Sequence, residues 1–463
     1  MSDRRWFFLF VGLLLAGCTL LPELPVPEPP VPQQWPGEEV EGEVVPSSLP
    51  AWRSYYPHPL LQELIAAALA SSRDLRAAAA RMEEARAMAG VAEAARWPTI
   101  HGEAAQQAVR TPGDLSTTGQ ESIGHRLDVG LSVPAFEVDF WGSLRSQDLA
   151  AQATFLASAE SLSALRILLI SQVVEQFIHW RELAERLVLA QAVLENRQAV
   201  QAIAGQRLQA GVERAQGKWL ADVAVEEARS ERAELQRQVA LAENALQLLT
   251  GISVDPQRSW PGLEELSGQA DLPVALPAQV MVVRPDVRAA EQRLRAAHAR
   301  IGVARAAFWP RIVLTSSVGT ASQGLSGLFH GGSLAWSFVP RLDLPIFDYA
   351  RRENELVAVT AQRDVLLAEY EKVVQQAFRE VADVLVSRGR WLERLQAMRV
   401  AREAQRARLG LLQARFRAGV EGRSVVLSGE QAVQLAEQQT RSAQRQLLVN
   451  RVLLYKVLGG GLE

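Results

Sequence analysis

The sequence predicts a mainly helical protein with a small β part, built as two structural repeats. A segment at residues 74–100 returns 212 residues later, at 286–312, without gaps and with 15 of its 27 positions identical. Each copy is rich in Ala, Arg and Glu, which favour helix, and each ends at a Trp-Pro followed by a short, alternating, β-like stretch. Residues 135–255 and 346–463 contain no proline, so each of these tracts can hold long helices.

The N-terminus is expected to be a lipoprotein signal peptide, residues 1–17. Arg4 and Arg5 precede an apolar run too short to span a bilayer, which ends in Leu-Ala-Gly-Cys. Cys18 is the single cysteine, and it is the expected site of lipidation, becoming a diacylated N-terminus. Thr19 follows it instead of an aspartate, which by resemblance to sorted lipoproteins indicates the outer membrane. The alternative is an ordinary signal peptide with an incidental cysteine.

A proline-rich tether is expected at residues 18–57, because 11 of the 22 prolines lie between positions 22 and 59. Such a segment is extended and semi-rigid. The expected divisions after it are a first repeat at 58–251 with strands 98–110 and 126–138, a connector near the equator at 252–283, and a second repeat at 284–463 with strands 310–320 and 333–344.

Each repeat is expected to end in a long antiparallel helical hairpin. One helix over 143–209 would measure about 100 Å at 1.5 Å per residue. RLQAGVE at 207–213 returns as RFRAGVE at 415–421. The glycines in these segments, Gly211 and Gly419, are expected to end the long helices as left-handed C-caps. A second helix then follows, near 218–249 in one repeat and 424–458 in the other, with coiled-coil-like packing.

Four strands in one chain leave two open sheet edges. In a bilayer each unpaired backbone group costs several kcal/mol, so strands that enter a membrane must be closed into a barrel by several chains. Three copies would supply twelve strands. The alternation of polar and apolar residues is too weak to decide which face would meet lipid. The alternative is a soluble four-stranded cap on a helical body.

Several segments, taken in order, carry a resemblance to a known family. They are FEVDFWGSLR at 136–145, VRPDVRAAE at 283–291, FWPRI at 308–312 and LDLPIFDY at 342–349. With the duplication and the two AGVE segments, residues 50–460 resemble the TolC-like outer membrane factor family, in its lipoprotein branch of efflux channels. The resemblance implies a homotrimer with a 12-stranded barrel and a 12-helix periplasmic tunnel. It also implies a periplasmic adaptor and a proton-driven inner-membrane pump as partners.

The same resemblance implies adaptor docking at the two hairpin tips, and a gate just after the second tip. The tip residues are Arg207, Gly211, Val212, Arg415, Gly419 and Val420. The acidic gate positions of many relatives align here with Val425 and Ser428, which are uncharged, so an acidic gate at these positions is in doubt. Other gate candidates are Glu421, Arg423 and Glu430. The alternative for these charges is ordinary solvated or helix-capping roles.

Other chemistry is not expected. A net charge of −3 gives no footprint for nucleic acid. GVERAQGK at 211–218 has five residues between its glycines, and Trp219 stands where a phosphate loop needs Ser or Thr. The six histidines lack ligand spacing, and no catalytic set is visible, so we expect no metal, cofactor or enzyme activity. Asp74 and Asp286 are expected to start helices.

The combined expectation is a lipid-anchored outer-membrane channel of a tripartite efflux system in a Gram-negative bacterium. It would conduct drugs or other solutes passively once its partners open the tips. Two alternatives stay open: the outlet of a type I protein secretion system, and a non-channel structural lipoprotein that acts as a coiled-coil spacer in the periplasm. The sequence does not identify the exported substrate.

Overall fold

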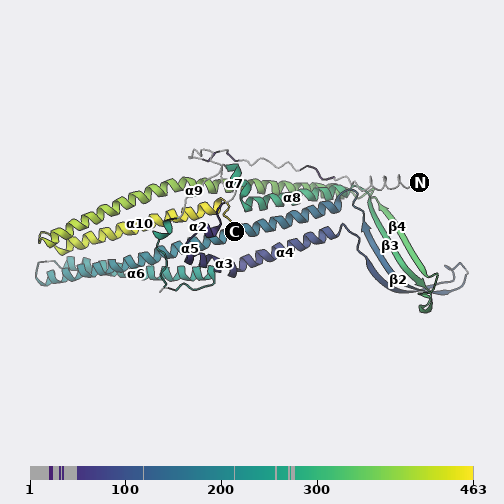
Figure 1. Cartoon of the computed structure of the whole chain (residues 1–463), viewed down its shortest axis with the longest axis horizontal. Coiled ribbons are helices and arrows are strands. Elements are labelled where there is room, and N and C mark those ends of the chain that lie inside the picture. The colour runs from purple at the N-terminus through teal and green to yellow at the C-terminus, as the bar shows by residue number, and fades with distance from the viewer. Residues whose placement is uncertain are drawn as a thin grey trace. The chain divides into compact units, whose positions relative to one another are not determined.

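The computed structural model describes residues 20–23, 31–32, 34–35, 49–117, 119–212, 214–255, 258–268, 272 and 277–461. Cys18, the signal peptide and much of the tether lie outside the described residues. The longer helices (Figure 1) are α3 (Pro59–Ser71), α4 (Arg73–Ala94), α5 (Ser143–Gln209), α6 (Ala215–Thr250), α8 (Pro285–Ala306), α9 (Arg351–Arg417) and α10 (Arg423–Val457). The shorter ones are α2 (Trp52–Tyr55) and α7 (Pro277–Val283). The prediction of a mainly helical protein is confirmed.

The chain folds into two compact units that cut across the sequence repeats. The first unit contains Ala80–Ala159 and Ala289–Glu371, and the second contains Glu160–Arg288 and Lys372–Glu463. The long helices α5 and α9 each contribute residues to both units, since each is 67 residues long. Each of these two helices is therefore long enough to belong to both units.

The first unit holds the sheet. Its strands are β1 (His101–Thr111), β2 (Ser122–Glu137), β3 (Arg311–Ser322) and β4 (Leu334–Asp343), antiparallel in the order β1-β2-β3-β4. Each repeat supplies one hairpin, and the β2–β3 pair joins the two. β1 and β4 are the open edges of this sheet.

The starts of β1 and β2 differ most from the expected bounds, and the other strand ends differ by one or two residues. β1 begins three residues later than expected, because the amides of Arg96 and Trp97 still donate to the carbonyls of Glu93 and Ala94 at the end of α4. β2 begins four residues earlier than expected, because its ladder with β1 continues to the pair of Thr111 and Ser122.

The register places apolar side chains of three strands on one face of the sheet. Leu131 pairs with Val318, and Val318 pairs with Trp336, so all three lie on the same face. The register adds further apolar members to this face: Val129, Val133, Phe136, Ile312, Leu314, Leu334, Phe338 and Leu342. The opposite face carries polar residues: Glu103, Gln107, Arg126, Asp128, Ser132, Ser317, Ser337 and Arg341.

In the second unit, two helical hairpins form one layer in the order α6–α5–α10–α9 (Figure 1). Leu194 of α5 packs on Val225 and Ala228 of α6. Within the second hairpin, Leu395 of α9 packs on Ala443 of α10. Ion pairs between α5 and α10 join the two hairpins, as described below. The layer therefore has two unlike edges, α6 and α9.

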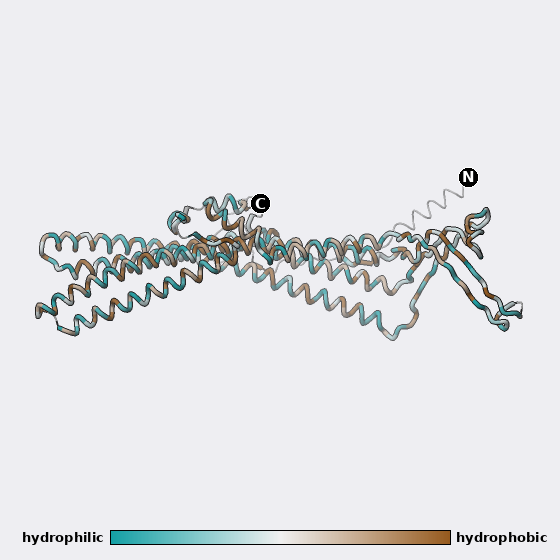
Figure 2. Tube along the Cα trace, turned by 90° about the horizontal axis from the view of Figure 1, so that it is seen from below, coloured by the Kyte–Doolittle hydropathy of each residue, from teal (hydrophilic) through white to brown (hydrophobic). Residues whose placement is uncertain are grey.

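The core of the second unit gathers near the C-terminal end of α10, where Figure 2 shows a concentration of hydrophobic residues. The Tyr55 and Tyr455 rings stack with their centroids 4.7 Å apart. Tyr56 meets the Tyr455 ring edge-on. Phe177 of α5 is fully buried against Trp180 and Trp260. Nearer the hairpin tips, apolar side chains pack between the two helices of each hairpin.

The hairpin tips as candidate functional site

The two long helices end in the same turn, as the sequence predicts. Gly211 and Gly419 have φ angles of +74° and +73°. In the first tip, residues 207–212, the Gly211 amide donates to Leu208 O and the Val212 amide donates to Arg207 O, both at 3.0 Å. This pattern is the Schellman motif, which needs a left-handed residue and therefore favours glycine.

The second tip, residues 415–420, repeats this turn. Its Gly419 amide donates to Phe416 O at 2.9 Å, and its Val420 amide donates to Arg415 O at 3.0 Å. Glu421 adds an ion pair to Arg415 at 3.0 Å. The matching residue of the first tip, 213, lies outside the described residues.

Both tips present apolar side chains and uncapped helix starts. Val212 and Val420 are 67% and 65% exposed. The following helices begin slightly earlier than expected, with Arg214 and Gly422 as N-caps, and neither cap makes a side-chain hydrogen bond to the helix. Amides in a first helical turn lack partners within the helix. The tips therefore offer exposed valines beside donor groups.

Four gate candidates lie on the first turns of α10, and the fifth, Glu421, lies just before this helix. Val425 is half-buried, and the exposed Ser428 uses its hydroxyl to donate to Val425 O at 2.8 Å. Arg423 pairs with Glu430 at 3.5 Å. The charged candidates therefore form pairs beside the tip, and the two uncharged positions lie between them in the sequence.

Asn196 of α5 ties the first hairpin to this region. It is buried, and its Nδ2 atom donates to Leu427 O at 3.1 Å and to the Glu430 carboxylate at 3.0 Å. Sequence reasoning missed this residue. The only signal was an asparagine, a poor helix former, inside a very long helix.

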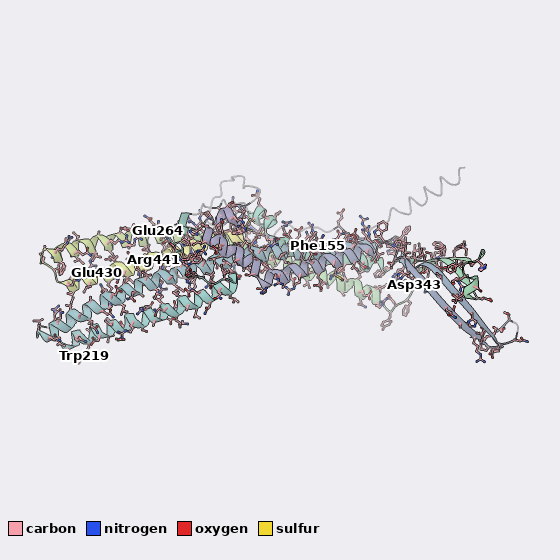
Figure 3. All side chains as sticks on the ribbon, turned by 60° about the horizontal axis from the view of Figure 1, so that its bottom comes forward. Phe155, Trp219, Glu264, Asp343, Glu430 and Arg441 are labelled. Atoms are coloured by element: carbon pink, nitrogen blue, oxygen red, sulfur yellow. The ribbon has the colours of Figure 1, made fainter. Side chains whose placement is uncertain are left out.

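Two ion pairs extend the contact between α5 and α10. Arg441 pairs with Glu185 at 2.9 Å, and Arg445 pairs with the buried Glu182 at 3.1 Å. Figure 3 labels Glu430 and Arg441, which lie on the same helix, α10. Burial raises the pKa of the Glu182 carboxyl, although Arg445 opposes the shift. The two hairpins of one chain are thus joined by buried polar contacts.

A family model described as outer membrane efflux protein matches residues 64–252 and 276–460, which together make up most of the chain. The chain belongs to the outer membrane efflux protein family.

Individual relatives of this efflux protein agree with the family assignment. The solvent efflux pump outer membrane protein SrpC of Pseudomonas putida is 36% identical over 458 residues, covering 98% of this chain and 97% of its own. Outer membrane protein OprJ of Pseudomonas aeruginosa is 35% identical, covering 98% of this chain and 95% of its own. The open state of the Neisseria gonorrhoeae MtrE outer membrane channel matches with a TM-score of 0.83 at 31% identity, covering 96% of this chain and 99% of that one.

The protein is accordingly an outer-membrane efflux channel and not an enzyme. No group of three His, Cys, Asp or Glu side chains that could hold a metal ion occurs in the described part of the chain. The residues described above form the turns at the hairpin tips and the contacts between helices.

The Arg-Pro-Asp segment of this efflux channel has a structural function that the sequence only partly indicated. The buried Arg284 donates to Asp286 at 2.7 Å, to Glu380 at 2.8 Å and to Val457 O at 2.9 Å. Burial alone would raise the pKa of Asp286, but the Arg284 guanidinium holds it below its usual range. Arg284 thereby joins the start of α8 to α9 and to the end of α10.

Asp74 and Asp286 both lie in the first turn of a helix, as expected. Asp286 accepts the Val287 amide at the start of α8, at 3.0 Å. At the start of α4, however, the Ser72 hydroxyl accepts the Leu75 amide at 3.2 Å. Ser72 therefore caps α4, two residues before Asp74.

Proposed function

We propose that three copies of this chain form the exit duct of a tripartite efflux system, a 12-stranded barrel that continues into a 12-helix tunnel. The observation that carries the proposal is the open four-stranded sheet, with β1 and β4 unpaired at its edges. An unpaired strand edge is costly in lipid, and closure between chains removes it. Three sheets give the even strand number of a small membrane barrel.

In this proposal the apolar sheet face meets lipid and the polar face lines the duct. Trp336 and Phe338 belong to an edge strand, and both are largely exposed in the single chain. Trp336 pairs with Val318 of β3 on the face that would contact the acyl chains. Asp128 and Arg126 lie on the opposite face, where water in the duct would solvate them.

The tips are proposed to receive a periplasmic adaptor, and the inner-membrane pump, driven by protons, would supply the energy. Exposed Val212 and Val420 beside uncapped helix starts suit a partner that brings both apolar and hydrogen-bonding groups. The channel itself would conduct passively. Adaptor binding can open it only by favouring the open state over the closed one.

Small organic solutes, including aromatic solvents, are the proposed cargo. This follows from relatives whose names refer to such compounds, the solvent efflux protein SrpC and the toluene efflux protein TtgI of Pseudomonas putida, each 36% identical to this chain. Deletion of the gene should sensitise the host to toluene, and restoring the chain should reverse the effect. Unchanged toluene tolerance with altered sensitivity to antibiotics would redirect the proposal to other solutes.

A lipid on Cys18 is proposed to anchor the chain in the outer membrane. The support is the Leu-Ala-Gly-Cys sequence and the absence of any other cysteine. Mass spectrometry of the mature N-terminus should find acyl chains on Cys18 and none in a Cys18→Ser variant. A mature chain that begins at another residue would overturn the anchor.

The duct is tested by single-channel recording of the purified, full-length protein in planar bilayers. Small, mostly closed openings that substitutions in residues 419–428 enlarge would support a conduit gated at the tips. A trimer that inserts without conducting would support a gate that stays shut without partners. Failure to insert would overturn the channel and favour a periplasmic spacer.

A further inference from the structure

The helices of the first unit form a hollow with a mostly apolar lining. Side chains of α4, α5, α8 and α9 line it, all from residues 80–159 and 289–371. Its volume is about 840 Å³, within the range of pockets that hold small organic molecules. Small side chains such as Ala150, Ala151 and Ala304 leave the space open, and Met88 and Val303 also line it. An organic molecule therefore fits here without displacing a bulky side chain.

Two hydroxyl side chains in this lining already have acceptors. The Thr154 hydroxyl donates to Ala150 O at 2.8 Å, and the Ser158 hydroxyl donates to Thr154 O at 3.1 Å. Covering a polar group is costly when its hydrogen bonds are lost, and much less so when they are kept. An apolar ligand can therefore lie over these two hydroxyls at little cost.

The charges around the hollow cancel. Arg81 and Arg300 are balanced by Glu84 and Glu355, and all four residues are exposed. A lining without net charge gives an ion no overall attraction. Met88, which is 60% exposed, adds a thioether, and thioethers make favourable contacts with aromatic rings. These features favour neutral molecules, and aromatic ones in particular.

The hollow lies on the side of α8 that faces away from the tether. Arg300 and Ala304, one turn apart on α8, line the hollow. His298 lies on the opposite side of this helix, at about 100° per residue, and its Nε2 atom is 2.8 Å from Pro22 O of the tether. The tether leads to Cys18, whose proposed lipid lies outside the duct. The hollow would therefore face the interior of the duct.

We propose that this hollow binds neutral aromatic molecules such as toluene on the inner wall of the duct. This inference rests on the proposed function and gives the proposed cargo a specific site. Aromatic solvents gain free energy when they leave water for an apolar surface. The hollow would therefore concentrate poorly soluble cargo inside the duct.

The test is photolabelling of the purified, full-length protein with a phenyldiazirine. On illumination this aromatic probe loses N₂, and the resulting carbene inserts into a nearby C–H bond. Mass spectrometry should locate the label within residues 147–158 and 300–307, and excess toluene should displace it. Labelling of the hollow should saturate as the probe concentration rises, whereas labelling of the lipid-facing side of the strands should rise steadily and serves as an internal reference.

Ala151→Trp and Ala304→Trp should each fill the hollow and lower its labelling about tenfold, which corresponds to losing the apolar contact of roughly two methylene groups. The matched control is Leu156→Trp, because Leu156 is 45% exposed and lies on the opposite face of α5 from Thr154. This control should leave the labelling unchanged. Ala304→Leu is a smaller substitution for the case in which tryptophan prevents folding, and it should lower the labelling in the same direction.

Labelling of the hollow that does not saturate, or that the filling substitutions leave unchanged, would overturn the site. An equal loss in the Leu156→Trp control would overturn it too. Single-channel recording of the unsubstituted protein separates these results from a failure of the duct. Conduction without saturable labelling would overturn the binding site and leave the proposed duct intact. Saturable labelling in a protein that does not insert into bilayers would overturn the duct and leave the binding site.

Discussion

The side-chain amide of Asn196 on α5 donates to the carboxylate of Glu430 on α10 at 3.0 Å. The same amide also donates to Leu427 O. The two acceptors lie on the first turns of the helix that follows the second tip. A side chain of the first hairpin is therefore hydrogen-bonded to the start of α10, the last helix of the second hairpin. A tip that moves outward must break these bonds or carry α5 with it.

Asn196→Ala should make the channel open more often. The substitution removes the amide that donates to Leu427 O and to the Glu430 carboxylate, which keeps its ion pair with Arg423. Losing these hydrogen bonds costs about 1–3 kcal/mol. If the cost falls on the closed state alone, the open-to-closed ratio rises by about 5- to 150-fold. Single-channel recording measures this ratio directly.

The matched control for that variant is Gln201→Ala. Gln201 also lies on α5, but its amide donates to Asp222 at 2.7 Å inside the first hairpin. Its loss should leave the opening frequency unchanged. Equal effects of the two variants would show that general loosening of α5, and not the contact between hairpins, controls opening.

Gly419→Ala should destabilise the second tip. The glycine has a φ of +73°, where an alanine costs about 1–2 kcal/mol. Gly410→Ala is the contrasting change, because Gly410 lies inside α9 with open space around an added Cβ, and alanine there should add about 0.5–1 kcal/mol. Thermal unfolding of both variants should show opposite shifts. A loss of stability in both would mean that the tip turn is not the reason.

Arg284→Met should destabilise the second unit by about 1.5–3 kcal/mol, the range for hydrogen bonds to charged groups. It removes the donor shared by Asp286, Glu380 and Val457 O. Arg288→Met serves as control, because Arg288 pairs with Glu160 through a half-exposed side chain. That pair should contribute less than about 1 kcal/mol. Chemical denaturation compares the two variants, and equal losses would refute a special function of Arg284.

The half-buried Glu175 should make stability depend on pH in an unusual direction. Burial raises its pKa, and Lys456 and Arg445 oppose the rise only in part. Below the ordinary value of 4.5 the carboxyl is protonated in both the folded and the unfolded chain. As the pH rises through the folded pKa, the folded chain must ionise a half-buried group, so its stability falls.

Glu175→Gln should therefore stabilise the protein at neutral pH, and the gain should disappear below about pH 4.5. Thermal unfolding from pH 4 to pH 8 measures the difference between the variant and the unchanged chain. A gain that is constant over the whole range would point to altered packing in place of ionisation.

The sequence by itself determined the helical class, the duplication, the two tip turns and the family. These features depend on local chemistry. Gly211 and Gly419 end their helices because glycine is favoured at a positive φ, and that preference acts within one turn of chain. The repeat is visible because both copies keep the same helix-to-strand switch at Trp97 and Trp309.

The tertiary structure alone decided which side chains share a sheet face and which residues join the hairpins. The alternation in β3 was too weak to show which face would meet lipid. The pairing of Leu131 with Val318 and of Val318 with Trp336 shows which apolar side chains share a face. Asn196 and Glu430 are 234 residues apart in the chain, so no pattern among neighbouring residues predicts their contact. Strand register and helix pairing arise from contacts between distant segments, and a single sequence without its fold does not specify which distant residues meet.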